Sequence, residues 1–308
     1  MEWDFRPLID LVKKSVPFAG DFAYRDYPPP MLLHGAVLPE RTNIKPPGKC
    51  IFCNGGPLSK EHVWGRRLRK HLPAWSSHTN HFTWTKDLET NSETFAPGRL
   101  HRPGDTLSQT LRVVCRDCNH GWMRAHVQEP AMPTLIRLIG GEWPRINDDE
   151  ARRIASWVTL FTMVSEFADP KTSAVSAEER REFSKSRTPL ENWSFLIGRY
   201  YDWDPSRRVA YGHRCLSAGP AGQHKVPNVQ TTAFILGGVL FYVFRSNTHF
   251  VNQDNGDVAH RNGLRVLWPT PATPIVRPDR VHNFSSFETL KNELPRRLRV
   301  STGPLGLP

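Results

Sequence analysis

Four of the five cysteines in this 308-residue chain form two Cys-x-x-Cys pairs, Cys50 with Cys53 and Cys115 with Cys118. Two residues between the thiolates of a pair let both sulfurs reach one metal ion, and two such pairs complete a tetrahedral Zn²⁺ site. A shell of four sulfurs leaves no open coordination position, so the sequence predicts a structural zinc ion. Two free redox dithiols are the alternative interpretation. The fifth cysteine, Cys215, is expected to be a buried or idle thiol.

A carboxylate, an imidazole and a carboxamide lie next to these pairs. Glu61 and His62 follow the first pair, and Asn119 directly follows the second. A histidine with a pKa of about 6.5 can accept a proton from water at neutral pH, and the side-chain oxygens of Glu61 and Asn119 suit Mg²⁺ or Mn²⁺. These three groups therefore predict phosphodiester hydrolysis. Two alternatives remain, since His62 can simply pack beside the zinc site and Asn119 can simply cap a helix.

A run of basic residues begins four positions after His62. The segment 62–72 is expected to be helical, with its basic side chains sharing one face. Beside a phosphate-cleaving site these residues are expected to contact a nucleic-acid backbone, although a solvated charged face is the ordinary alternative. The predicted contacts are Arg66, Arg67, Arg69, Lys70 and His120.

The elements that must position these groups predict an α+β protein in three parts. Residues 1–48 are expected to form an N-terminal arm, and residues 49–128 a zinc-bound domain. In that domain, alternating apolar residues predict strands in 82–95 and 106–114, followed by a helix from Cys118. The 61 residues between the cysteine pairs exceed a simple zinc ribbon, so they must fold on their own.

Residues 129–308 are expected to form a separate α+β unit whose role the sequence does not assign. An acidic start at 148–150 and a capping box at Ser176 predict two helices, and a third is expected near 284–294. Strands are expected at 193–200, 231–236 and 239–245. No chemical motif is evident in this unit. It can support the predicted phosphodiester hydrolysis, select the target of that reaction or dock a partner protein.

Charge and hydropathy narrow the function classes. The chain carries 41 Lys and Arg against 30 Asp and Glu, a net charge of +11 that favours a polyanionic partner. The longest apolar run, 231–244, is too short for a membrane span and contains a Gly-Gly pair, which predicts a β-hairpin. No secretory signal is evident at the N-terminus. We expect a cytoplasmic protein that does not contact membranes.

The run CIFCNGGPLSKEHVWGRRLRKHL … LRVVCRDCNHGWM resembles the HNH endonucleases, the ββα-metal nucleases with a treble-clef zinc site. The resemblance covers roughly residues 50–125 and is closest to the four-cysteine subgroup. It implies that His62 is the general base and that Glu61 and Asn119 bind the catalytic metal. It also implies that the four cysteines hold the structural zinc, and that cleavage leaves 5′-phosphate and 3′-hydroxyl ends. Double-stranded DNA is the expected substrate, in bacterial or phage restriction or defence.

The chain departs from the family pattern in three places. Thr110 stands where the middle Asn of the motif is usual, Glu61 replaces the commoner Asp, and Trp64-Gly65 replaces a Pro after the histidine. Thr110 favours a second hypothesis, a non-catalytic zinc module that binds nucleic acid or a partner protein within a larger complex. The intact set of Glu61, His62 and Asn119 favours the enzyme.

Overall fold

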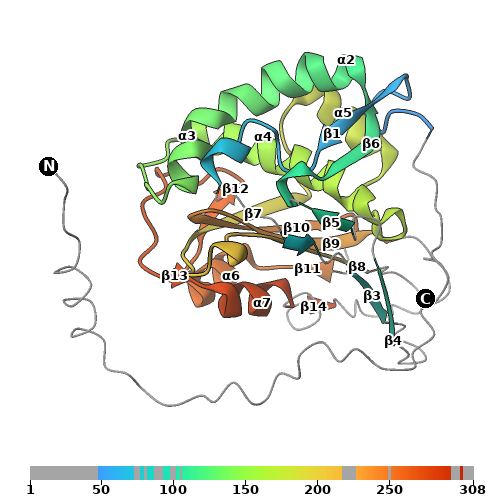
Figure 1. The fold of residues 1–308 in the computed structure, drawn as a ribbon. Coiled ribbons are helices and arrows are strands. Elements are labelled where there is room, and N and C mark those ends of the chain that lie inside the picture. The colour runs from blue at the N-terminus through green and yellow to red at the C-terminus, as the bar shows by residue number, and fades with distance from the viewer. Residues whose placement is uncertain are drawn as a thin grey trace, which may run out of the picture. The chain divides into compact units, whose positions relative to one another are not determined.

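A six-stranded sheet built from residues 193–282 lies between layers of helices in the computed structural model (Figure 1). Its order is β12-β7-β10-β9-β8, with all neighbours antiparallel, and β13 adds a short parallel pairing to β7. The strands are β7 (Trp193–Tyr200), β8 (Val209–Leu216), β9 (Val229–Leu236), β10 (Val239–Ser246), β12 (Arg265–Trp268) and β13 (Val281–His282). The structure describes residues 48–72, 77–79, 82–86, 93–97, 102–104, 106–216, 227–248, 251–292 and 299–300.

The central strands are buried on both faces, which explains why their sequence is a continuous apolar run. Alternate residues of β9 and β10 pack into two different clusters. Phe234 and Phe241 point to one face, whereas Ile235 and Leu240 point to the other. Each face therefore needs its own cover of helices.

Helix α4 (Asp148–Ser165) covers the first face. It begins with a capping box between Asn147 and Glu150, and its Trp157 and Phe161 pack on the aromatic rings of the sheet. Helices α6 (Asn255–Asn262) and α7 (Phe284–Lys291) cover the second face (Figure 1). The sheet is thus enclosed between two helical layers.

Helix α3 (Glu129–Ile139) ends against the turn between β9 and β10. The N–H of Gly238 donates to the carbonyl of Ile139 at 2.8 Å. A Cβ at Gly237, whose φ is +55°, would lie 2.4 Å from that same carbonyl oxygen. The Gly-Gly pair is therefore needed both for the turn and for the close approach of α3.

Helix α5 (Ala177–Ser186) is tied to the sheet by a buried ion pair. Its Ser176 and Glu179 form a capping box, and the Glu179 carboxylate also accepts from Arg245 of β10, with Nε to Oε1 at 3.0 Å. The guanidinium of Arg245 is 1% exposed and donates further to the carbonyls of Ala174 and Asn228. Each of the three guanidinium nitrogens of Arg245 thus has a hydrogen-bond acceptor, as a buried cation requires.

The remaining regular elements are short. Two-stranded antiparallel pairs join β2 to β5, β3 to β4 and β11 to β14. Their bounds are β2 (Ser77–Thr79), β3 (Phe82–Lys86), β4 (Glu93–Pro97), β5 (Arg102–Gly104), β11 (Val251–Asn252) and β14 (Arg299–Val300). Single 3₁₀ turns occur at Arg69–His71, Thr106–Ser108, Glu166–Ala168, Pro170–Thr172 and Pro205–Arg207.

The mixed α+β class predicted from the sequence is confirmed, as are the hairpin of β9 and β10, the helix with an acidic start at 148–150 and the capping box at Ser176. The helix predicted for 62–72 is wrong: a strand reaches His62, and only Arg69–His71 is helical. Strands β8 and β12 were not anticipated. Residues 1–47 of the predicted arm lie outside the described residues.

The three-part division of the chain stays a prediction. A helical segment runs through its boundary at 128–129, from Asn119–Gln128 directly into α3. One cluster of buried side chains extends from Cys50 to Ile275 across the same boundary. Among the described helices, none is long and apolar enough to span a lipid bilayer.

We predict that His282 makes stability depend on pH. Its ring is 1% exposed, and burial, with the charge of Arg280, lowers its pKa from 6.5 to about 4. Between pH 6.5 and 4 the ring stays neutral in the folded protein but is protonated in the unfolded chain. The stability that depends on the neutral ring is therefore complete above pH 6.5 and is lost as the pH falls toward 4. His282 should account for about 3 kcal/mol of lost stability across this window, measured by urea unfolding as the difference between the wild type and a variant without this ring. The variant His282→Gln should lose clearly less, and equal losses would contradict the prediction.

Candidate metal centre and active site

Two antiparallel strands followed directly by a helix form the frame of the site. Strand β1 (Leu58–His62) pairs with β6 (Thr110–Cys115), with Leu58 opposite Cys115 and His62 opposite Thr110. Helix α2 (Arg116–Cys118) starts at the end of β6 and continues into the segment Asn119–Gln128. This pairing brings the two ends of the long intervening loop together.

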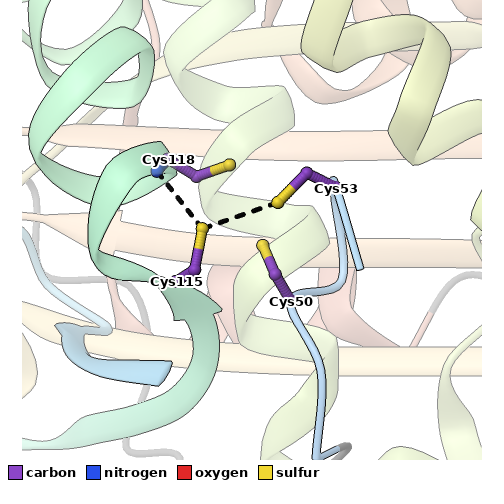
Figure 2. Close-up of side chains that lie close together, drawn as sticks. All are labelled: Cys50, Cys53, Cys115 and Cys118. Atoms are coloured by element: carbon purple, nitrogen blue, oxygen red, sulfur yellow. Dashed lines mark hydrogen bonds between the residues drawn. The ribbon is translucent and has the colours of Figure 1, made fainter. Parts of the chain in front are cut away.

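The four cysteines of the two pairs converge at the end of this strand pair (Figure 2). Their sulfur atoms all lie within 4.8 Å of one another, and Cys53 Sγ is 3.5 Å from Cys115 Sγ. Sulfurs bound to one tetrahedral zinc ion lie about 3.8 Å apart, given Zn–S bonds of about 2.3 Å. The cluster therefore has the donor type, number and spacing to hold a metal such as zinc. Among the described residues it is the one such cluster of His, Cys, Asp or Glu side chains.

Backbone N–H groups point at these sulfurs. Gly55 donates to Cys53 Sγ at 3.3 Å, and Cys118 donates to Cys115 Sγ at 3.4 Å. Burial raises the pKa of Cys50, but N–H groups of Cys115, Cys53 and Phe52 outweigh it and lower the pKa overall. Such N–H donors favour thiolates, the form that binds metal, whereas burial raises the pKa of Cys53 and of Cys118. Cys215 stands apart from the cluster, and burial raises its pKa to about 12, as expected of an idle thiol.

Glu61 and His62 occupy the last two positions of β1, just after an irregularity in its pairing. Asn119 begins the helical segment, and its Nδ2 donates to Ser59 Oγ at 3.1 Å. Glu61 and Asn119 are both 8% exposed, while His62 is half-buried. The strand pair and the helix thus bring the three predicted residues into one region.

Burial shifts the pKa values of Glu61 and His62 in opposite directions. Burial raises the pKa of Glu61 to about 7, although the side-chain amides of Gln128 and Asn119, which hydrogen-bond to the carboxyl, act to lower it. Burial lowers the pKa of His62, and the charges of Arg66 and Arg69 lower it further. His62 is therefore neutral at pH 7 and able to accept a proton.

Gln128 is a site residue that the sequence analysis missed. Its Nε2 donates to Glu61 Oε1 at 3.2 Å. Nine positions from Asn119 correspond to about two and a half α-helical turns, which would place Gln128 on the opposite face. The segment instead has π-type hydrogen bonds, with wider turns, and a break at Gly121. With these wider turns, nine positions come close to two full turns. The side-chain amides of Asn119 and Gln128 therefore both face Glu61.

Helix α4 forms a wall beside Glu61 and His62. Trp157, Phe161 and Val164 of α4 line a small cavity with these residues and with Gln128. Its volume of about 20 Å³ has room for one water molecule. Trp64, two residues after His62, packs against Phe161 with ring centroids 5.0 Å apart and the ring planes tilted by 34°. On the α4 side, the space beside Glu61 and His62 is therefore limited to this small cavity.

The predicted basic contacts are all exposed. These residues are Arg66, Arg67, Arg69, Lys70 and His120. Leu68 and Leu72 of the same segment are buried, which turns the basic side chains to solvent. Arg67 NH2 pairs with Glu129 Oε1 at 2.9 Å, so part of its charge is already compensated. Arg66 and Arg69 lie close enough to His62 to affect its pKa.

Helix α5 holds the first cysteine pair in place. Arg180 donates from Nε to the carbonyl of Ile51, whose own N–H donates to Val113 of β6. The same guanidinium pairs with Glu166 Oε1 at 3.1 Å, and that carboxylate is fully buried. Trp122 packs between Phe52 and Phe183, with ring centroids 5.2 and 6.0 Å away. The cysteine cluster is thus packed into the main core.

Comparisons of this chain with models of known protein families, with curated proteins and with solved structures give no match.

We predict that Arg180→Met lowers the free energy of unfolding by about 3 kcal/mol, because it leaves the Glu166 carboxylate buried without its partner. Arg181→Met is the matched control. Arg181 is the next residue of α5, is 49% exposed and, among the described residues, forms its one ion pair with exposed Glu178, so its loss should cost under about 0.5 kcal/mol. Urea unfolding of the two variants compares them directly. Equal costs would show that the Arg180 contacts do not stabilise the fold.

Proposed function

We propose that this protein is a metal-dependent endonuclease of the HNH type, in which a structural zinc ion supports a site that hydrolyses DNA phosphodiester bonds. One observation carries the proposal. The strand pair closed by the four cysteines places Glu61 and His62 at a strand end and Asn119 at the start of the following helix. This order of two strands and a helix is the one that the resemblance to ββα-metal nucleases implies.

In this proposal His62 accepts a proton from the attacking water. The bond from the water oxygen to phosphorus forms as the bond to the 3′ oxygen breaks, which leaves a 5′-phosphate. The low pKa of His62 keeps its ring neutral and ready for this step at pH 7. Arg66, Arg69 and Lys70 hold the phosphate backbone, and such contacts position a duplex without reading its sequence.

Glu61 and Asn119 would hold the catalytic Mg²⁺ or Mn²⁺. Mg²⁺ usually takes one or two carboxylates from the protein and completes its shell with phosphate oxygens and water, so this pair fits it. The chemistry such an ion supplies when bound is Lewis-acid stabilisation of charge on the leaving oxygen. Gln128 contributes by fixing one oxygen of the Glu61 carboxylate.

Double-stranded DNA is the proposed substrate, and bacterial or phage restriction or defence the proposed setting, in the cytoplasm. The alternative is a non-catalytic zinc module that binds nucleic acid or a partner protein. The narrow cavity between Glu61 and α4 favours this alternative, because it leaves little room around the carboxylate. Both hypotheses require the zinc ion.

We predict about one zinc ion per chain by elemental analysis, lost in Cys115→Ser. Removal of the ion should lower the midpoint of thermal unfolding, because four thiols packed within 4.8 Å then lack their common partner. Cys215→Ser is the matched control and should keep its zinc, since this thiol stands outside the cluster. A metal-free protein as stable as the zinc-loaded one would overturn the structural role.

We predict that the protein nicks supercoiled plasmid with Mg²⁺ or Mn²⁺, and that His62→Ala is slower by about a hundredfold or more. His126→Ala is the matched control, because His126 is exposed on the helical segment after Asn119. Zinc content and circular dichroism should be unchanged in both variants.

Two results would count against the enzyme. Equal cutting by wild type and His62→Ala would remove His62 from the role of general base. A zinc-loaded wild type that cuts neither plasmid nor linear duplex with either metal would favour the binding module.

A further inference from the structure

Three of the four exposed large apolar side chains of the described residues lie at the end of β7 and on β13, which pairs with it. Tyr201 and Trp203 directly follow β7 and are 61% and 77% exposed. Val281 is 45% exposed and pairs with Arg199 of β7, and the fourth such residue, Val276, precedes it by five positions. A single exposed apolar residue is ordinary, whereas such a group marks a binding surface.

The same two segments, 199–208 and 276–282, are rich in arginine. They carry five arginines and three aspartates, namely Arg199, Arg207, Arg208, Arg277 and Arg280 with Asp202, Asp204 and Asp279. The carboxylate of Asp202 is buried and accepts from backbone N–H groups, so it does not face this surface. The surface is therefore positively charged.

Contacts join the arginines to the aromatic residues. The guanidinium of Arg208 lies 5.3 Å from the ring centroid of Tyr201. Arg199 donates to the carbonyls of Pro278 and Asp279, and its pKa is lowered by burial and by the nearby charge of Arg277. These contacts bring both segments onto one surface.

Two of the arginines are exposed without a carboxylate partner. Arg277 and Arg280 are exposed and pair with no carboxylate that the structure describes. They are thus free to bind anions from solution. We name the set Arg199, Tyr201, Trp203, Arg208, Arg277 and Arg280 the aromatic–arginine surface.

The loop that presents the two rings is braced. Asp202 Oδ1 accepts from the N–H of Asp204 at 3.1 Å, and Oδ2 accepts from the N–H of Phe284 at 3.3 Å. The Tyr201 N–H donates to the carbonyl of His282 at 2.9 Å, and the Tyr200 hydroxyl donates to the carbonyl of Arg207. The rings are therefore held in solvent by a fixed backbone, which reduces the entropy that a ligand must remove.

We propose that the aromatic–arginine surface binds single-stranded nucleic acid. Unpaired bases stack on Trp203 and Tyr201, and the arginines contact the phosphates, which is how sequence-tolerant single-strand sites are built. The positive charge favours a polyanion over an ordinary protein partner. Unpaired bases are favoured over a duplex because duplex bases already stack on one another and offer no free face.

This site is separate from the one proposed for cleavage. β13 lies away from β1 and α2 in Figure 1, and its pairing with Arg199 and Tyr200 places the end of β7 beside it. The proposal does not rest on the nuclease activity, since its evidence comes from other residues. It gives the C-terminal part of the chain a function of its own.

The test measures fluorescence anisotropy of labelled oligothymidylate of about 15 nucleotides, a length that suits sites of this kind. Without added Mg²⁺ or Mn²⁺ no cleavage should complicate the titration. Trp203→Ala should weaken binding about tenfold, and Trp203→Phe should restore most of it. Arg277→Ala should also weaken the salt dependence of binding. The slope of the logarithm of the binding constant against the logarithm of the salt concentration should become shallower by about 0.7. Arg181→Met, an exposed arginine elsewhere, should behave like the wild type.

Two outcomes would overturn the proposal. In one, Trp203→Ala binds the oligonucleotide as tightly as the wild type. In the other, a duplex of equal length binds more tightly than the single strand, which would indicate a general electrostatic surface. Repeating the titration with His62→Ala separates the two proposals. If the protein binds the single strand through Trp203 but never cuts a plasmid, the proposal of single-strand binding is supported and the nuclease proposal is refuted.

Discussion

The antiparallel pairing of β1 with β6 is the constraint on which the candidate site depends. It joins residues that are about 50 positions apart, and closing a loop of that length costs about 4 kcal/mol of chain entropy. Two strands alone are marginal in water. The pair must therefore be stabilised from outside, and three groups in the structure can do so: the four cysteines at its end, α4 beside it and α5 behind the first cysteine pair.

Helix α5 connects this pair to the central sheet through two neighbouring residues. Arg180 contacts Ile51 beside the cysteines and the buried Glu166, whereas Glu179 pairs with the buried Arg245 of β10. Buried ion pairs are costly to desolvate and add little net stability, but they tolerate few alternative arrangements. We infer that their role is to fix the position of α5. The geometry at the cysteines is thus linked to the sheet.

The sequence predicted the parts of the fold that local patterns determine. The Cys-x-x-Cys spacing, the acidic start of α4, the capping box at Ser176 and the apolar runs of β7, β9 and β10 each depend on neighbouring residues. Strand β8 escaped prediction because all its residues are half-buried and no clean alternation results. The helix expected at 62–72 failed because pairing with β6 extends the strand to His62. The helix was predicted from the local sequence pattern, which contains no information about this long-range contact.

The candidate site was predictable in its residue types but not in its surroundings. Glu61, His62 and Asn119 were predicted from their side-chain types, from their positions beside the cysteine pairs and from the resemblance to HNH endonucleases. The contact of Gln128 with Glu61 depends on π-type turns and a break at Gly121, and a 3.6-residue period conceals it. The wall formed by α4 depends on how a helix some 90 positions further along the chain packs against the strand pair. Neither feature leaves a local sequence signal.

The burial of Glu61 separates the two hypotheses about function. A carboxylate that is 8% exposed is costly to hold as an anion without a cation, and none of the ion pairs in the described part of the chain involves it. Two amides donate to it, which partly offsets the cost of desolvation. In a non-catalytic module about half of the Glu61 carboxyls would be protonated at pH 7, and the two amides would offset part of the cost for the rest. In a nuclease a divalent ion would compensate the charge and keep the carboxylate ionised, so such an enzyme would require the ion for a reason that precedes catalysis.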